Sequence, residues 1–445
     1  MAKNKVSYVC SHCGAMHSTW AGRCSQCGEW NTIEEQLRVT TATAGASGAK
    51  LELKSVDTVA AQKPMTRITV GLGDIDDVLG GGIVPGSVIL IAGQPGIGKS
   101  TLLMQISSLI ASKKRVVYIS GEESAEQVAM RASRLGAKGK ELELGTSTSA
   151  NDIAATLASE PADVVVIDSI QTIACNEIAS AAGSVSQITN STQLITQAAK
   201  KTSTALIIVG HVTKEGSIAG PKVLEHLVDV VLQLEGDRYG GFKVLRAIKN
   251  RFGSTNEASI FEMVHEGLKP VSNPSAALLE ERQVSDGSVV LATLEGTRPL
   301  LVEVQALVNT SSYGYPKRTA SGFDINRLNL LVAVLEKRTK LNLADKDIYI
   351  NIVGGIKVQD PAADLAVCLA IGSAAKGLRL SKDAVVFGEV GLSGEVRHVS
   401  HAEKRVKEAL KLGFEVAVGP KQKGKIESSL HQVSDVREAL NTYLK

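Results

Sequence analysis

One short segment, residues 93–100, constrains the fold more than any other part of this 445-residue chain. Its sequence, GQPGIGKS, fits the pattern G-x-x-x-x-G-K-[ST], and it follows an apolar run and precedes a stretch with helical spacing. Glycines allow such a loop to curl so that backbone N–H groups and the start of the helix face phosphate oxygens. A glycine-rich turn with a chance lysine is the alternative, but the complete motif in this context favours a phosphate-binding loop.

The nucleotide that we expect at this loop is ATP, together with Mg²⁺. Lys99 is predicted to reach the β and γ phosphates, and the Ser100 hydroxyl to hold the metal. The predicted nucleotide-binding residues are Gly93, Gln94, Pro95, Gly96, Ile97, Gly98, Lys99, Ser100 and Thr101.

The loop lies in a long region of alternating short aliphatic runs and helical stretches. This alternation is typical of βαβ units under a buried parallel sheet. The aliphatic runs are residues 88–91, 116–119, 164–167, 206–209 and 230–232, and helices are expected to begin near Lys99, Ser124, Ala150, Val185 and Pro221. With 44% hydrophobic and 21% charged residues, the composition excludes a disordered or collagen-like chain.

A phosphate loop also needs an acidic residue at the end of a neighbouring strand to hold the metal. Asp168 follows four aliphatic residues and fits this position, with an ordinary turn-capping aspartate as the alternative. Hydrolysis further needs a group that orients or deprotonates water. Glu122 is the first candidate and Glu123 the second, and a surface carboxylate at a helix start explains either one equally simply.

His211 ends another aliphatic run at the same predicted sheet edge. It could sense the γ-phosphate and relay the signal through Lys222 to Lys214, or it could be structural; the sequence leaves both interpretations open.

Two cations, Lys249 and Arg251, stand two residues apart in the string KNRFG at a predicted strand end. The period of two points them the same way. Such a pair suits an arginine finger that enters the ATP site of the next subunit. A solvated basic edge strand is the alternative.

Four of the six cysteines form two CxxC pairs near the start of the chain. Cys10, Cys13, Cys24 and Cys27 fit a tetrahedral Zn²⁺ site, because each tight turn presents two thiolates on one side. A redox pair is the alternative, although one CxxC would serve that purpose. Clustered thiols and the lack of a signal peptide or apolar span predict a cytoplasmic protein without membrane contact.

The chain is long enough for two or three domains, and its composition and pattern of predicted elements change at two places. Residues 36–66 are rich in Ala, Thr, Gly and Ser and are predicted to be a linker. After residue 271, a predicted hairpin of 289–294 and 300–308 precedes a helix beginning near Ile325. We therefore predict a zinc ribbon at 1–35, an α/β ATPase domain at 67–270 and an α+β domain at 271–445.

The motifs taken together, WAGRCSQCGEWNT, GQPGIGKST, VVVIDS and KNRFG, resemble the bacterial RadA (Sms) family of DNA-repair proteins over essentially the whole chain. The resemblance implies a RecA-like P-loop core that assembles into a ring, expected to be hexameric, with ATP between subunits. It implies that Lys99, Ser100, Asp168 and Glu122 carry hydrolysis, while Lys249 and Arg251 act across the interface and in DNA-dependent function.

The C-terminal part, 271–445, resembles the Lon protease domain, whose chemistry is a serine nucleophile activated by a lysine. Here Ala362 stands at the position of the serine and Glu403 at that of the lysine, with Lys404 one residue away. Without a hydroxyl there is no nucleophile. The resemblance therefore implies a scaffold for oligomerisation and DNA contact without peptidase activity.

The partners follow from the same resemblance: single-stranded and branched DNA, and the RecA recombinase during branch migration. A net charge of only +3 excludes a uniformly basic surface, so DNA contacts must be local. The candidates are Lys214, Lys222, Lys249 and Arg251, with a scattered solvated face as the alternative. A nucleotide-binding switch that recruits partners without moving along DNA is the competing function.

Overall fold

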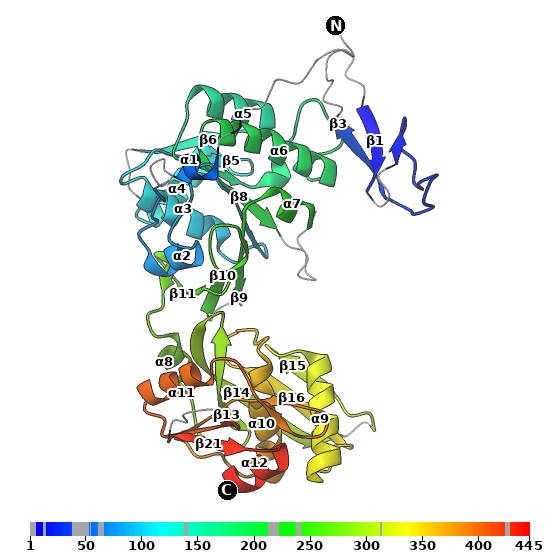
Figure 1. Ribbon diagram of the computed structural model, residues 1–445, viewed down its shortest axis with the longest axis vertical. Coiled ribbons are helices and arrows are strands. Elements are labelled where there is room, and N and C mark those ends of the chain that lie inside the picture. Colours follow the sequence, from blue (N-terminus) through cyan, green and yellow to red (C-terminus); the bar gives the residue numbers. More distant parts are fainter. Residues whose placement is uncertain are drawn as a thin grey trace. The chain divides into compact units, whose positions relative to one another are not determined.

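The computed structural model describes residues 6–11, 15–37, 53, 55–60, 66–137, 141–211, 222–236, 242–311, 314–422 and 428–445. Contacts divide the chain into two compact units (Figure 1). The first is Met1–Glu235, Leu245–Thr255 and Val264–Leu268; the second is Gly236–Val244, Asn256–Met263 and Lys269–Lys445. The units interleave in sequence because β10 (Phe242–Asn250) and β11 (Ala258–Val264) each contribute residues to both. The boundaries at 67–270 and 271–445 stay predictions.

Six parallel strands form the centre of the first unit, in the order β9-β4-β8-β7-β5-β6. Five of them form where the sequence predicts strands, because runs of Val, Ile and Leu suit a sheet that is buried on both faces. The sixth, β6, was not predicted, because its sequence LELGT contains no aliphatic run. Their bounds are β4 Val88–Gly93, β5 Val116–Ser120, β6 Leu142–Thr146, β7 Val164–Asp168, β8 Ala205–His211 and β9 Val230–Gly236.

Helices pack against this sheet and begin at local capping signals. The Ser124 hydroxyl caps α4 in a capping box, and Ser149 and Ser184 cap α5 and α6. Helices α5 and α6 lie side by side and share a core with Leu90 of β4 (Figure 1). The bounds are α2 Gly73–Val78, α3 Lys99–Ile110, α4 Ala125–Arg134, α5 Ala150–Ser159, η1 Ile170–Thr172, α6 Val185–Lys201 and α7 Lys222–Leu227.

The N-terminal residues form a small antiparallel sheet, ordered β2-β1-β3, with bounds β1 Val6–Cys10, β2 Met16–His17 and β3 Ile33–Leu37. Within the predicted linker the structure has one short helix, α1, at Val56–Ala60. The Ser55 hydroxyl accepts a hydrogen bond from the Thr58 N–H at 3.2 Å. Five residues are too few to show a helical period in the sequence, which explains why this helix was not predicted.

The second unit is built on a seven-stranded sheet, ordered β15-β16-β14-β13-β17-β20-β21. The predicted hairpin is present as antiparallel β13 and β14, and Asp324 caps the predicted helix α9. The bounds of this part are β12 Gly267–Pro270, α8 Pro274–Leu279, β13 Ser288–Glu295, β14 Arg298–Thr310, β15 Arg318–Ser321, α9 Ile325–Thr339, β16 Lys346–Ile352, η2 Pro361–Ala363, α10 Asp364–Lys376, β17 Ala384–Val386, β18 Glu389–Val390, β19 Val396–Arg397, α11 Ala402–Lys411, β20 Val416–Pro420, β21 Leu430–Val433 and α12 Val436–Tyr443.

Among the described residues, none of the helices has the length and apolar character that crossing a membrane requires.

Candidate functional site

The segment 93–100 joins β4 directly to α3, as its motif predicts. Gly96 and Gly98 have φ of 78° and 113°, in the left-handed region that favours glycine. A Cβ on Gly93 would lie 2.7 Å from the Leu234 carbonyl oxygen, so this position has no room for a side chain. Gly98 supplies no side-chain cap, so the first N–H groups of α3 point into the loop without a capping side chain. The loop therefore suits an anionic phosphate, which accepts backbone N–H groups at a helix start.

Lys99 is the buried cation of this loop. Its side chain is 4% exposed, and its Nζ donates to the carbonyl oxygens of Gly93 at 2.8 Å and Gln94 at 3.0 Å. Burial lowers the pKa of Lys99 to about 8, while the negative charges of Asp168 and Glu122 oppose that shift. The loop cation and the two predicted acidic residues thus act on one another electrostatically.

The acidic residues meet the loop because parallel strands end at one edge of the sheet. Gly93 pairs in register with His211, and Ser120 with Asp168. Asp168 is the last residue of β7. His211 is the last residue of β8, so its backbone lies beside the loop. The carboxyl edge of the sheet therefore brings together the loop, Asp168 and the segment that follows β5.

Tyr118, a residue that sequence reasoning missed, holds Asp168 in place. The Tyr118 hydroxyl donates to Asp168 Oδ2 at 2.6 Å, and the tyrosine side chain is completely buried. Burial, with the Asp168 charge as a further cause, raises the pKa of Tyr118, so the hydroxyl keeps its proton and acts as a donor. The signal in the sequence is a tyrosine within the aliphatic run of residues 116–119.

The two candidate bases have different neighbours. Ser169, directly after Asp168, donates its hydroxyl proton to Glu122 Oε1. Glu123 forms an ion pair with Arg131 of α4. The Glu122 side chain therefore lies beside the residue that follows Asp168, whereas the Glu123 side chain is held by α4.

Lys249 and Arg251 lie at the opposite edge of the same sheet. Lys249 Nζ donates to the carbonyl oxygens of Glu225 and Val228 at the end of α7, the latter at 2.7 Å. Arg251 pairs with Asp229 Oδ1 at 3.1 Å.

The contacts of Asp229 show that Arg251 lies at the amino-terminal end of β4, where the strand begins. Asp229 Oδ2 accepts from the N–H of Val88, the first residue of β4, at 3.0 Å. The six residues of β4, about 20 Å of strand, separate this edge from the phosphate loop. Arg251 therefore cannot reach the loop of its own chain, and its side chain is 55% exposed.

Two candidate DNA-contacting lysines give less information. Lys214 lies outside the described residues. Lys222 is the first residue of α7, whose other end is held by Lys249.

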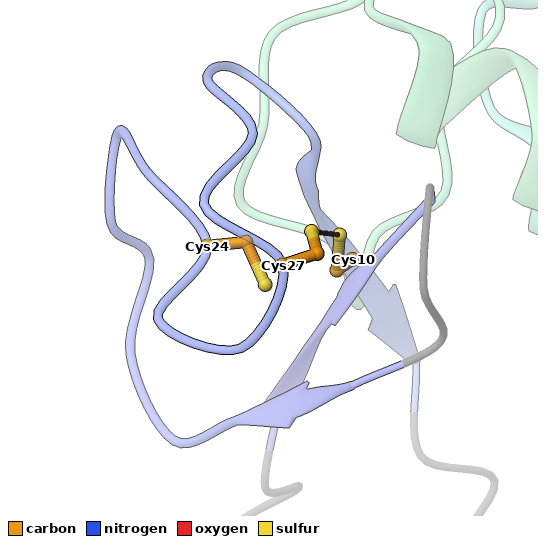
Figure 2. A group of neighbouring side chains, drawn as sticks. All are labelled: Cys10, Cys24 and Cys27. Carbon is orange, nitrogen blue, oxygen red and sulfur yellow. Dashed lines mark hydrogen bonds between the residues drawn. The ribbon is translucent and has the colours of Figure 1, made fainter.

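Cys10 at the end of β1 and two cysteines of the loop between β2 and β3, Cys24 and Cys27, bring their sulfur atoms together (Figure 2). The Sγ atoms of Cys10, Cys24 and Cys27 lie within 4.8 Å of one another, and those of Cys10 and Cys27 are 3.7 Å apart. Cys13, the predicted fourth ligand, lies outside the described residues. The Cys27 N–H is the main cause that lowers the pKa of Cys24 to about 5, which makes it a thiolate at neutral pH. Three converging sulfur atoms with one already ionised fit Zn²⁺.

His17 is also close to this group: its Nε2 lies 3.5 Å from Cys24 Sγ. The sequence alone gave no reason to connect His17 with the cysteines, because β1 and β2 bring it there through their pairing.

In the second unit, the positions that resemble the protease dyad hold no nucleophile. Ala362 is fully buried in η2, and the exposed Glu403 pairs with Lys407 at 2.6 Å. Beside them, the fully buried Arg405 donates to Asp360 Oδ2 at 2.6 Å. Asp360 also accepts from the Ala362 N–H at 3.0 Å. These contacts join η2 to α11 inside the fold, while Arg405 Nη2 has no hydrogen-bond partner among the described residues.

Three protein-family models match parts of the chain. They are described as the AAA domain over residues 60–217, the rubredoxin metal binding domain over 8–35 and subunit ChlI of Mg-chelatase over 328–423. Together with the structure, they confirm a P-loop α/β core that follows an N-terminal zinc ribbon and precedes a C-terminal α+β domain.

Similar whole chains give a more specific result. The chain is 46% identical to the DNA repair protein RadA of Aquifex aeolicus over 443 residues, which is 99% of each chain. It is 49% identical to that of Pseudomonas aeruginosa over 426 residues, 94% of each chain. It is 47% identical to that of Bacillus subtilis over an alignment of 463 positions that spans both chains completely.

Proposed function

This chain belongs to the RadA family of DNA repair proteins, and from that premise we propose that it is a DNA-dependent ATPase that drives recombinational repair. One observation carries the proposal: the buried Lys99 of the phosphate loop lies within the electrostatic reach of Asp168 and Glu122 at one sheet edge. A buried cation with two nearby carboxylates and open helix N–H groups suits phosphoryl transfer to water.

Each residue has a role in this proposal. Lys99 and the loop N–H groups bind the phosphates, and Ser100 and Asp168 hold Mg²⁺, which when bound neutralises phosphate charge. Glu122 orients a water molecule and accepts its proton as the water oxygen attacks the γ-phosphorus and the bond to the bridging β–γ oxygen breaks.

The finer proposal is a ring, expected to be hexameric, with each ATP shared by two subunits. Arg251 supports it, because this exposed cation lies about 20 Å from the loop of its own chain, so that an ATP phosphate in its reach would belong to another subunit. We further propose that His211 senses the γ-phosphate and relays the signal through Lys222 to Lys214, and that Lys249 acts with Arg251 across the interface and in DNA-dependent function.

The substrates that we propose are single-stranded and branched DNA, handled with the RecA recombinase during branch migration. The relatives are named as DNA repair proteins, which supports DNA as the substrate class. The ribbon is proposed to hold Zn²⁺ through Cys10, Cys13, Cys24 and Cys27. The clustering of the ribbon cysteines around one point supports a reducing, cytoplasmic setting as part of this proposal.

The second unit is proposed as a scaffold for assembly and DNA contact. The buried Ala362 and the exposed Glu403 support the lack of peptidase activity. Casein cleavage that survives substitution of every serine near Ala362 would be needed to restore a protease function.

Steady-state ATP turnover with and without single-stranded DNA, across a salt series, tests the proposal. We expect DNA to stimulate turnover, and the stimulation to fall as salt rises, because phosphate contacts release counterions. The competing function, a switch that recruits partners without moving along DNA, predicts slow turnover that DNA does not change.

A further inference from the structure

Two exposed tryptophans stand together on the N-terminal ribbon. Trp20 and Trp30 are 61% and 67% exposed, although tryptophan is among the costliest side chains to leave in water. A Cβ on Gly22 would lie 3.8 Å from the Trp30 ring and 3.9 Å from the Trp20 ring, so both rings approach one point. The two rings and this glycine form one small patch, which we name the tryptophan patch.

The cysteine knuckle holds the patch in a fixed geometry. Arg23 and Trp30 face each other in a β-bridge, and the Asn31 N–H donates to the Gly22 carbonyl at 2.8 Å. The Arg23 guanidinium lies 5.7 Å from the centre of the Trp30 ring, and its Nε donates to the Gly28 carbonyl at 2.7 Å. The ring orientation thus depends on the turn that carries Cys24 and Cys27.

We propose that the tryptophan patch is a stacking platform for unpaired bases of single-stranded DNA, with Arg23 beside it as the cationic group. Indole rings stack on any base, and a guanidinium next to them suits the backbone phosphate. The choice of DNA rests on the proposed function, but the site is separate from the nucleotide loop.

Size favours a base over a protein as the occupant. A stable protein interface takes roughly 20–30 residues on each side, nearly the whole ribbon. Stacking needs only one ring for each base. Glu29, exposed beside Trp30, weakens any purely electrostatic attraction, so stacking must supply most of the binding.

The chain offers a direct probe, because Trp20 and Trp30 are its only two tryptophans. We would titrate the zinc-loaded full chain with oligodeoxythymidylate and follow tryptophan fluorescence, with fluorescence anisotropy of a labelled strand to confirm binding. The proposal predicts that tryptophan fluorescence falls and reaches a plateau as the strand saturates the protein. The depth of that plateau should change little with salt as long as the strand is bound.

Single substitutions assign the signal. Trp20→Phe and Trp30→Phe each keep an aromatic face and leave one tryptophan as the reporter, and both proteins should still be quenched. Trp30→Ala should weaken single-strand binding roughly five-fold or more. Met130→Ala, which removes another exposed large apolar side chain from α4 of the first unit, is the matched control and should leave binding unchanged. Zinc content of each variant checks that the ribbon is intact.

Unchanged tryptophan fluorescence in protein saturated with single-stranded DNA would overturn the inference. Quenching by purified RecA recombinase in the absence of DNA, with none by the strand, would also overturn it and assign the patch to a protein. Either result leaves the proposed ATPase function intact, because that function is judged by DNA-stimulated turnover.

Discussion

Two buried cations, Lys99 in the first unit and Arg405 in the second, differ in what their charged groups contact. Lys99 Nζ donates to two loop carbonyl oxygens, and the negative charges of Asp168 and Glu122 act on it. Arg405 lies in direct contact with Asp360, and it also donates to the Ala292 carbonyl at 2.8 Å. We propose that the first charge serves a bound phosphate. The second pairs with a carboxylate inside the fold and stabilises the second unit.

The substitution Lys99→Ala tests the proposed role of Lys99 in the phosphate loop and has the largest expected effect. Removing the cation takes away phosphate binding and transition-state stabilisation, so ATP turnover should fall by a factor of about 100 or more. Steady-state phosphate release measures it. Turnover that persists in this variant would remove the loop from the mechanism.

The substitution Arg405→Ala tests whether the buried Arg405–Asp360 ion pair stabilises the second unit. It leaves Asp360 partly buried without its cation, and the free energy of unfolding should fall by about 3–5 kcal/mol. Chemical denaturation measures the change. Glu403→Ala, at an exposed position on the same helix, is the control and should stay within about 0.5 kcal/mol of the parent. Equal losses of unfolding free energy in Arg405→Ala and Glu403→Ala would contradict a stabilising role for the Arg405–Asp360 ion pair.

The substitution Tyr118→Phe sharpens the comparison by removing one hydrogen bond to Asp168 while keeping the packing. The concentration of Mg²⁺ that gives half-maximal turnover should rise about tenfold, because groups that orient a metal ligand typically matter to that extent. A Mg²⁺ titration at saturating ATP measures it. A fall in turnover that no Mg²⁺ concentration reverses would show that Tyr118 does more than orient the carboxylate.

The pH dependence of ATP binding is the smallest effect. In the free protein burial lowers the pKa of Lys99 to about 8, and bound phosphate should raise it again. Above about pH 8, binding must therefore take up a proton, and ATP affinity should fall by a few-fold as pH rises. Calorimetry in two buffers of different ionisation enthalpy measures the uptake. Binding without proton exchange at pH 9 would contradict the assigned environment of Lys99.

Local signals were enough to predict much of the fold and the loop. β-branched runs gave the strands, and the glycines and Lys99 gave the phosphate loop. Strand pairing was not readable, and so the Tyr118–Asp168 contact, which depends on the register of β5 and β7, was missed. The sequence also predicted Arg251 at a strand end, but it did not show in which direction that strand runs. The direction of the strand places Arg251 at the edge of the sheet opposite the phosphate loop.

That placement supports the central proposal, that two chains complete one ATP site. A mixing experiment tests it most directly. Lys99→Ala lacks a working loop but keeps Arg251, and Arg251→Ala has the reverse defect, so each variant alone should turn over ATP slowly. Mixed rings, with co-assembly checked by size, should regain turnover at interfaces that combine an intact loop with an intact Arg251. A mixture no more active than its components, or full activity of Arg251→Ala alone, would contradict the account.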